Sequence, residues 1–121
     1  MNKYRNKKVY CDGMMFDSRR EARRYHELYL LQKAGRIKDL QRQVPFLLIP
    51  DQREPDTIGK RGGVHKGRII ERKTLYIADF SYFDCDSGQI TVEDAKGFKT
   101  PEYRLKKKLM LWIHGIRIQE V

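Results

Sequence analysis

The chain has 121 residues, of which 40% are hydrophobic and 35% charged, with 26 Lys and Arg against 16 Asp and Glu, a formal net charge of +10. This length fits one domain with its own core, and the composition excludes a disordered chain or a disulfide-dense scaffold. No apolar run approaches the roughly 20 residues that a membrane helix needs, and no secretory segment is visible, so we expect an intracellular protein that does not span a membrane. The excess of positive charge favours a polyanionic partner, although ribosomal, chromatin and membrane-surface proteins share it.

The first expected elements are a hairpin and a helix. The apolar stretches of residues 8–16 flank an Asp-Gly pair, which favours a tight hairpin turn. Ser18 and Glu21 have the spacing of a capping box, and apolar residues recur at helical spacing behind them. We therefore predict a helix over residues 18–34.

The middle of the chain is expected to be extended. Residues 37–49 read as a strand that ends before a proline. Residues of about 51–70 are rich in Gly, Pro and charge, which predicts a long, flexible, basic loop, and long loops in small domains are often functional. Two further strands follow at 72–83 and 89–96, separated by a turn.

The C-terminal part is expected to form a helix and a short strand. Pro101 suits a first helical turn, and Leu105, Leu109 and Trp112 form an apolar stripe over residues 101–114. Residues 116–121 read as a last strand. The order is thus hairpin, helix, three strands, helix and strand, which predicts a single α/β (α+β) domain over residues 1–121.

Strand alternation sorts the charged residues at the end of the strand over 89–96. Successive side chains point to opposite faces, so Asp94 and Lys96 share a face with the apolar Val92. Glu93 should point away from them. On the preceding strand, Asp79 shares a face with the apolar Leu75 and Ile77 in the same manner. If the two strands pair, Asp79 and Asp94 meet at the edge of a common core.

Two carboxylates on a partly buried face are unfavourable together unless a cation neutralises them. Mg²⁺ is expected here, because hard cations take oxygen ligands and keep waters for substrate chemistry. Such an ion would polarise a phosphodiester oxygen and activate a water, while Lys96 would orient that water and stabilise developing negative charge. The competing interpretation is a structural salt bridge between Lys96 and an aspartate, since short acidic–basic patterns are common. Charged groups at a core face favour the functional interpretation.

Glu21 is a further candidate for this site. It shares the inward face of its helix with Tyr25 and Leu28, which lie four and seven residues later. The capping box alone would also explain a glutamate at this position.

These residues occur in a characteristic order along the chain. Glu21 on a helix, Asp79 on a strand and Asp94-Ala95-Lys96 on the next strand, followed by a basic helix, resemble the PD-(D/E)xK nuclease superfamily. The resemblance covers nearly the whole chain.

Three short sequence motifs extend the resemblance. The sequences FDSRRE at 16–21, YIADF at 76–80 and VEDAKG at 92–97 are similar to a family of small phage and prophage proteins placed in that superfamily. Ala78 stands where the superfamily name has its proline, a residue that does no chemistry.

The resemblance implies a restriction-endonuclease-like core of helix, three strands, helix and strand. It implies that Asp79, Asp94 and the backbone carbonyl of Ala95 bind Mg²⁺ or Mn²⁺, that Glu21 often joins them, and that Lys96 assists catalysis. The implied activity is endonucleolytic hydrolysis of DNA in phage replication or recombination, in the cytoplasm of a bacterial or phage-infected cell. Holliday-junction resolvases belong to this superfamily, and a resolvase would need two sites in a symmetric homodimer.

Basic residues around the second helix and the loop are expected to bind duplex or branched DNA. Phosphate contacts would dominate, and the helix N-terminus near Thr100 offers free N–H groups to a phosphate. The expected DNA-binding residues are Lys99, Thr100, Arg104, Lys106 and Lys107 at the helix, and Lys66, Arg68 and Arg72 in and after the loop. Arginines on the first helix read equally well as a solvated face.

Two other functions compete with a nuclease. A non-catalytic nucleic-acid-binding protein could keep the nuclease core as a scaffold, and it would bind DNA without a metal at Asp79 and Asp94. A basic regulatory or interaction protein would not depend on the lysines of the second helix for DNA affinity.

Overall fold

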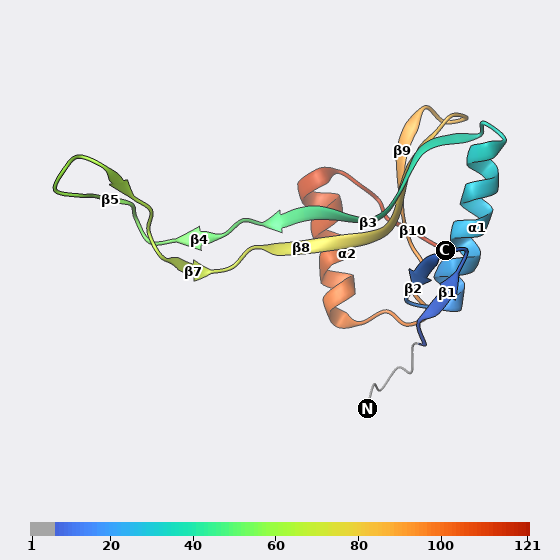
Figure 1. Cartoon of the computed structure of the whole chain (residues 1–121), viewed down its shortest axis with the longest axis horizontal. Helices are drawn as coiled ribbons and strands as arrows, with labels where there is room; N and C mark the ends of the chain where they lie inside the picture. The colour runs from blue at the N-terminus through green and yellow to red at the C-terminus, as the bar shows by residue number, and fades with distance from the viewer. Residues whose placement is uncertain (1–6) are drawn as a thin grey trace.

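A computed structural model describes residues 7–121 as a mixed α+β fold around a four-stranded sheet of order β10-β9-β8-β3 (Figure 1). The strands are β3 (Ile37–Ile49), β8 (Thr74–Asp84), β9 (Gln89–Asp94) and β10 (Gln119–Glu120). β8 pairs antiparallel with both β3 and β9, whereas β10 pairs parallel with β9. The helices and the strands of this sheet follow the predicted order of helix, three strands, helix and strand, but four short strands that were not predicted lie between β3 and β8.

The N-terminal hairpin and the first helix form where local signals predict them. β1 (Val9–Cys11) pairs with β2 (Met14–Phe16), and both turn residues have positive φ, as a tight primed turn requires. α1 (Arg19–Lys33) is capped by Ser18, whose Oγ accepts the N–H of Glu21 at 3.1 Å. The Glu21 carboxylate reaches back to the N–H of Asp17, so the predicted capping box forms with one end shifted by a residue.

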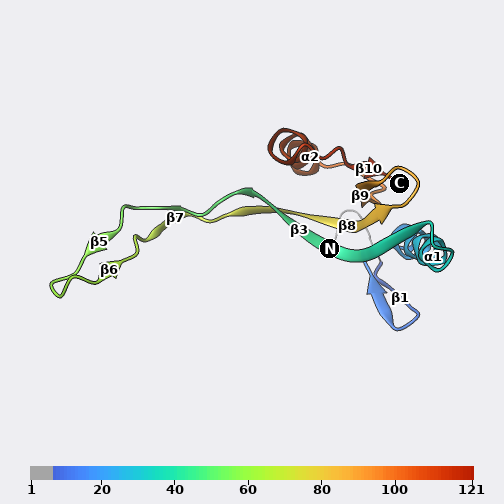
Figure 2. The ribbon, with the colours of Figure 1, turned by 90° about the horizontal axis from the view of Figure 1, so that it is seen from above.

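The two helices lie on opposite sides of the strands and build two hydrophobic clusters (Figure 2). Leu28 of α1 packs in one cluster, and Tyr103 and Met110 of α2 (Pro101–His114) pack in the other. The C-terminal half of β9, residues 92–94, is therefore buried on both faces, whereas its first residues are exposed. No helix of residues 7–121 is long and apolar enough to span a bilayer.

β8 changes the side of its core contacts halfway along. Tyr76 and Ala78 pack in the cluster under α2, whereas Phe80 and Tyr82 pack in the cluster under α1. All four have the same strand parity, so a regular strand would place them on one face. The chain therefore changes face between Ala78 and Phe80, at Asp79.

The predicted alternation of buried and exposed residues along β8 is therefore wrong. Leu75 and Ile77, which we expected to line the core with Asp79, are half-buried and exposed respectively, and the core residues are the alternate ones. Asp79 is buried although its predicted apolar neighbours are not.

Residues 50–73 form a β-ribbon rather than the expected loop, and we call this segment the arm. β4 (Gln52–Arg53) pairs with β7 (Ile69–Glu71), and β5 (Thr57–Ile58) pairs with β6 (Val64–His65) nearer the tip. The arm continues the paired β3 and β8 and projects away from both helices in Figures 1 and 2.

Three predicted details of the C-terminal part are wrong. Leu105 and Trp112 of the expected apolar stripe are 58% and 81% exposed, because Tyr103 and Met110 form the buried face of α2. β9 ends at Asp94, short of the predicted end at Lys96, and β10 covers only two residues of the expected last strand.

Candidate functional site

Asp79 lies at the point where β8 changes face, 9% exposed. Its Oδ2 accepts the backbone N–H of Ala95 at 2.7 Å, which ties β8 to the chain just after β9. Within residues 7–121, its Oδ1 has only a long contact of 3.5 Å with the amide of Gln43. Gln43 stands on β3 with a φ of 52°, so the backbone is irregular beside the site as well. Asp79 therefore keeps one weakly engaged oxygen.

Asp94 is the last residue of β9 and is 1% exposed. Its Oδ2 accepts a hydrogen bond of 2.5 Å from the hydroxyl of Tyr76. Burial and the Asp94 carboxylate raise the pKa of Tyr76 far above its usual value, so this hydroxyl stays a donor. The other oxygen, Oδ1, is buried and has no hydrogen-bond partner within residues 7–121. A buried carboxylate oxygen without a hydrogen-bond donor is costly, so it needs a cation nearby, and the described chain supplies the Lys96 ammonium at 3.4 Å.

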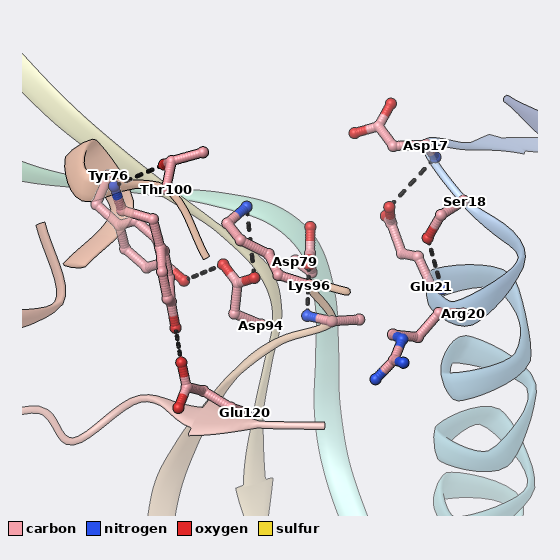
Figure 3. Close-up of polar contacts among 12 residues, drawn as sticks. Asp17, Ser18, Arg20, Glu21, Tyr76, Asp79, Asp94, Lys96, Thr100 and Glu120 are labelled. Carbon is pink, nitrogen blue, oxygen red and sulfur yellow. Dashed lines mark hydrogen bonds and ion pairs between the residues drawn. The ribbon is translucent and has the colours of Figure 1, made fainter. Parts of the chain in front are cut away.

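Lys96 is the cation nearest to this oxygen in the described structure. Its Nζ lies 3.4 Å from Asp94 Oδ1 and 5.2 Å from the ring centroid of Tyr103, and its side chain is 38% exposed. Figure 3 shows Asp79, Asp94 and Lys96 grouped between Tyr76 and the helix that carries Glu21. Sequence reasoning thus placed the two aspartates and the lysine together, and the structure brings them together.

Glu21 is buried but is held by protein donors on both oxygens. Oε1 accepts from Gln43 at 3.0 Å and lies 3.4 Å from Arg42, while Oε2 accepts the N–H of Asp17. The Arg42 guanidinium in turn lies 4.0 Å from the ring centroid of Phe16. Glu21 therefore has a complete structural role, and it is less available than the two aspartates to a metal.

The carboxylates influence one another electrostatically. Burial raises the pKa of Asp79 to about 6, and the negative charges of Asp94 and Glu21 act in the same direction. The Ala95 hydrogen bond and the positive charge of Lys96 oppose the shift. An acid whose neighbours are acids is stabilised by a bound cation, and perturbed carboxylates of this kind are frequent at functional sites.

The site opens to solvent through a cleft of about 580 Å³. α1 and its N-terminal cap form one wall, and the segment between β9 and α2 forms the other. The lining residues are Lys8, Asp17, Ser18, Glu21, Asp79, Ala95, Lys96, Gly97, Phe98 and Thr100. A cleft lined by three acids and two lysines suits a phosphate ester held against a metal.

Over residues 1–115 the sequence matches the model of a protein family described as "Protein of unknown function (DUF1064)". The chain belongs to this family. No curated protein and no solved structure gives a significant match.

In this DUF1064 member the possible metal donors are few. The described residues contain no group of three or more His, Cys, Asp or Glu side chains arranged to hold a metal ion. Asp79 and the main chain at Ala95 line the cleft, whereas Asp94 is 1% exposed and is not among the residues that line it. Such a set would leave most positions around a cation to water and substrate, as Mg²⁺ sites commonly do.

Glu93 has a structural role that sequence reasoning missed. It points away from Asp94, as predicted, but it is 1% exposed rather than solvated. Arg24 of α1 donates two hydrogen bonds to its carboxylate, at 2.8 and 2.7 Å, and the Tyr82 hydroxyl donates a third. This network fixes β9 to α1 directly behind Asp94. The arginine on α1 is the sequence feature that could have indicated a buried acidic partner. Its partner Glu93 lies 69 residues away in the sequence, so no local pattern connects the two.

The expected DNA-binding residues near α2 are mostly engaged in ion pairs. Lys99 and Lys107 both contact Glu120, at 3.3 and 2.8 Å, and Lys106 contacts Glu102 at 3.0 Å. Arg104 is exposed. Thr100 caps α2 by accepting the N–H of Tyr103, and it also lines the cleft. Lys66, Arg68 and Arg72 lie on the arm and are not among the residues that line the cleft.

Proposed function

We propose that this protein is a Mg²⁺-dependent endonuclease that hydrolyses DNA phosphodiester bonds, with a restriction-endonuclease-like core. One observation carries the proposal. Asp94 presents a buried oxygen with no hydrogen-bond partner in the described chain, beside Asp79, whose pKa is raised to about 6 by burial and by neighbouring acids. A divalent cation between them would relieve both features.

The donor chemistry fits such an ion. Asp79 Oδ1 and Asp94 Oδ1 are the less engaged oxygens of the two carboxylates, and the backbone carbonyl of Ala95 is the further ligand that the resemblance implies. Tyr76 and the Ala95 N–H hold the remaining oxygens and so fix the orientation of each carboxylate. When bound, Mg²⁺ supplies Lewis-acid polarisation of the phosphate and a water of lowered pKa.

Lys96 supplies the positive charge that the chain itself brings to the reaction. Its partly exposed side chain lies at the cleft wall, so its ammonium group can contact a phosphate oxygen as negative charge develops. In the free protein it neutralises part of the charge of Asp94. When DNA enters the cleft, the Lys96 ammonium would leave Asp94 and contact a substrate phosphate. Its charge would therefore act on the reaction only when DNA is bound.

Purified protein tests the proposal on duplex, single-stranded, flapped and four-way-junction DNA, with Mg²⁺ or Mn²⁺. We expect cleavage of at least one substrate that is abolished by EDTA and reduced at least about 100-fold by Asp94→Asn. Asp86→Asn is the matched control, because Asp86 is an exposed acid whose only described role is an ion pair with Arg36. It should leave cleavage unchanged.

Metal binding is measured separately by Mn²⁺ titration followed by electron paramagnetic resonance. Wild type and Asp86→Asn should bind Mn²⁺, and Asp94→Asn should bind it at least tenfold more weakly. Cleavage that survives Asp94→Asn, or the absence of cleavage of every substrate, would refute the nuclease proposal.

A non-catalytic DNA-binding protein on the same scaffold is the second candidate. It is favoured by the protein donors that already engage each acid, which are Tyr76 on Asp94, the Ala95 N–H on Asp79, and Arg42 with Gln43 on Glu21. This candidate predicts salt-sensitive DNA binding, no metal binding, and equal DNA affinity of wild type and Asp94→Asn.

A further inference from the structure

The arm is a hydrogen-bonded β-ribbon rather than an irregular loop. Its two strands are joined by backbone hydrogen bonds from Glu54 to Arg68 and from Gly59 to Gly63, and the Asp56 carboxylate accepts the N–H of Gly67. Gly67 lies so close to the opposite strand that a Cβ atom there would stand 1.7 Å from the Glu54 carbonyl oxygen. The ribbon therefore depends on glycine at this position.

The arm contributes nothing to the described core. Neither hydrophobic cluster includes a residue of 50–73, and almost every side chain of the arm is exposed. An ordered ribbon that stabilises no core needs another reason for its order, because holding a chain in one conformation costs entropy.

The tip of the arm combines apolar and basic side chains. Ile58 and Val64 are paired across β5 and β6, so they share one face of the ribbon, and they are 79% and 70% exposed. Residues 57–68 contain Lys60, Arg61, Lys66 and Arg68 and no acidic residue. The tip thus offers an exposed apolar pair surrounded by positive charge.

Charge complementarity selects the partner. A second copy of this chain would bring the same positive tip, or a body of net charge +10, against these four basic residues. Double-stranded DNA has the opposite charge, and its major groove is wide enough for a two-stranded ribbon, with apolar contacts available at the thymine methyl groups. A-form RNA lacks such an open major groove.

We propose that the tip of the arm enters the major groove of double-stranded DNA, with Lys60 and Arg61 on phosphates and the Ile58–Val64 pair against base edges. This rests on the proposed function insofar as DNA is the substrate of the cleft. The duplex is then held at two places, the cleft and the arm tip. The strand β5 at the arm tip lies at the opposite end of the molecule from α1, whose N-terminal cap lines the cleft (Figure 1).

Fluorescence anisotropy of the full chain with labelled duplex DNA, in EDTA and over a series of salt concentrations, tests this proposal. Lys60→Gln with Arg61→Gln should lower the slope of log affinity against log salt by about 1.8 and weaken binding about 30-fold near 0.15 M salt. The matched control is Lys33→Gln with Arg117→Gln, which removes the same charge from exposed residues outside the arm and the cleft. Its affinity should change less than about threefold.

A second variant tests the groove contact itself. Ile58→Ser with Val64→Ser should weaken binding about tenfold with the salt slope unchanged, because apolar contacts release no counterions. Wild type should bind duplex DNA more tightly than duplex RNA or single-stranded DNA, and this preference should be lost in the Ile58→Ser, Val64→Ser variant.

Each other result overturns the proposal in a distinct way. Wild-type binding with both arm variants equal to the control removes the arm from the DNA interface and leaves the nuclease proposal standing. Equal wild-type affinity for duplex DNA and duplex RNA refutes entry into the major groove. A wild-type dimer that Ile58→Ser with Val64→Ser converts to monomer assigns the tip to a second copy. No binding of wild type to any nucleic acid refutes the arm proposal and the nuclease proposal together.

Discussion

Replacement of Asp79 by Asn should stabilise the metal-free protein at neutral pH while abolishing its proposed activity. Burial and the charges of Asp94 and Glu21 raise the pKa of Asp79 from 3.8 to about 6. Each pKa unit corresponds to about 1.4 kcal/mol, so the ionised carboxylate costs the fold about 3 kcal/mol relative to its protonated form. An asparagine keeps an acceptor for the Ala95 N–H and carries no charge. We therefore expect Asp79→Asn to add about 1–3 kcal/mol to the free energy of unfolding at pH 7.

The pH dependence of this gain gives the sharper measurement. A carboxyl group whose pKa is higher in the folded state binds protons more tightly there, so its contribution to stability falls as pH rises from about 4 to about 6. The stability difference between Asp79→Asn and wild type should be near zero at pH 4, grow up to pH 6 and then remain constant. Urea unfolding in EDTA at a series of pH values measures it, and Asp86→Asn should show no such rise.

Mg²⁺ should offset the advantage of the variant. A ligand at 100 times its dissociation constant stabilises the folded state by about 2.7 kcal/mol, and this gain should be smaller in the Asp79→Asn variant, which lacks one of the two proposed carboxylate ligands. An Asp79→Asn protein that is less stable than wild type at pH 7 in EDTA, or a difference that does not vary with pH, would refute the argument that burial and the neighbouring acids raise the pKa of Asp79.

Three further predictions address the lysine, the buried acid and the arm. Lys96→Ala should reduce cleavage about 100- to 1000-fold and leave DNA affinity within about tenfold, because the Lys96 ammonium acts on the negative charge that develops during the reaction. Single-turnover cleavage with parallel binding measurements checks this. A Lys96→Ala enzyme of normal rate would exclude Lys96 from the reaction. Glu93→Ala should lower the free energy of unfolding by about 3 kcal/mol, because it leaves the half-buried Arg24 and the Tyr82 hydroxyl without their acceptor. Glu27 is an exposed partner of Arg24, so Glu27→Ala should lower the free energy of unfolding by less than about 1 kcal/mol. Equal urea midpoints of these two variants would contradict the structural role of Glu93. Gly67→Ala should increase hydrogen exchange at the Glu54 and Gly67 amides without changing protection in α1 and α2, since the added Cβ collides only with the arm; loss of protection in the helices would show that the arm supports the core.

Elements with local causes were predicted well from the sequence. The turn between β1 and β2, the cap of α1 at Ser18 and the ends of α2 at Pro101 and Gly115 each depend on a few adjacent residues. Such signals are present in the chain whatever its tertiary contacts. The order of the elements followed from them.

Features with distant causes were not predictable in the same way. The burial of Glu93 depends on Arg24. The face change at Asp79 depends on the packing of α2 against the first half of β8 and of α1 against the second half. The arm depends on pairing between strands of two or three residues, which carry too little periodicity to register as strands. Asp79 and Asp94 were nevertheless brought together correctly, because strand adjacency in a hairpin is itself a local relation.

The same two strands support both proposed contacts with DNA. β3 carries Gln43 beside the cleft and continues into β4, while β8 carries Asp79 and receives the chain from β7. Their register from Val44 opposite Ala78 to Leu47 opposite Leu75 is continuous, so this paired segment fixes where the arm departs relative to the carboxylates. A duplex held at both places would meet Asp79 and Asp94 at a defined distance from the bases that contact the arm tip. If both proposals hold, cleavage by wild type should fall at a fixed spacing from the footprint of the arm, and Gly67→Ala should broaden that spacing while leaving the chemistry at Asp94 intact.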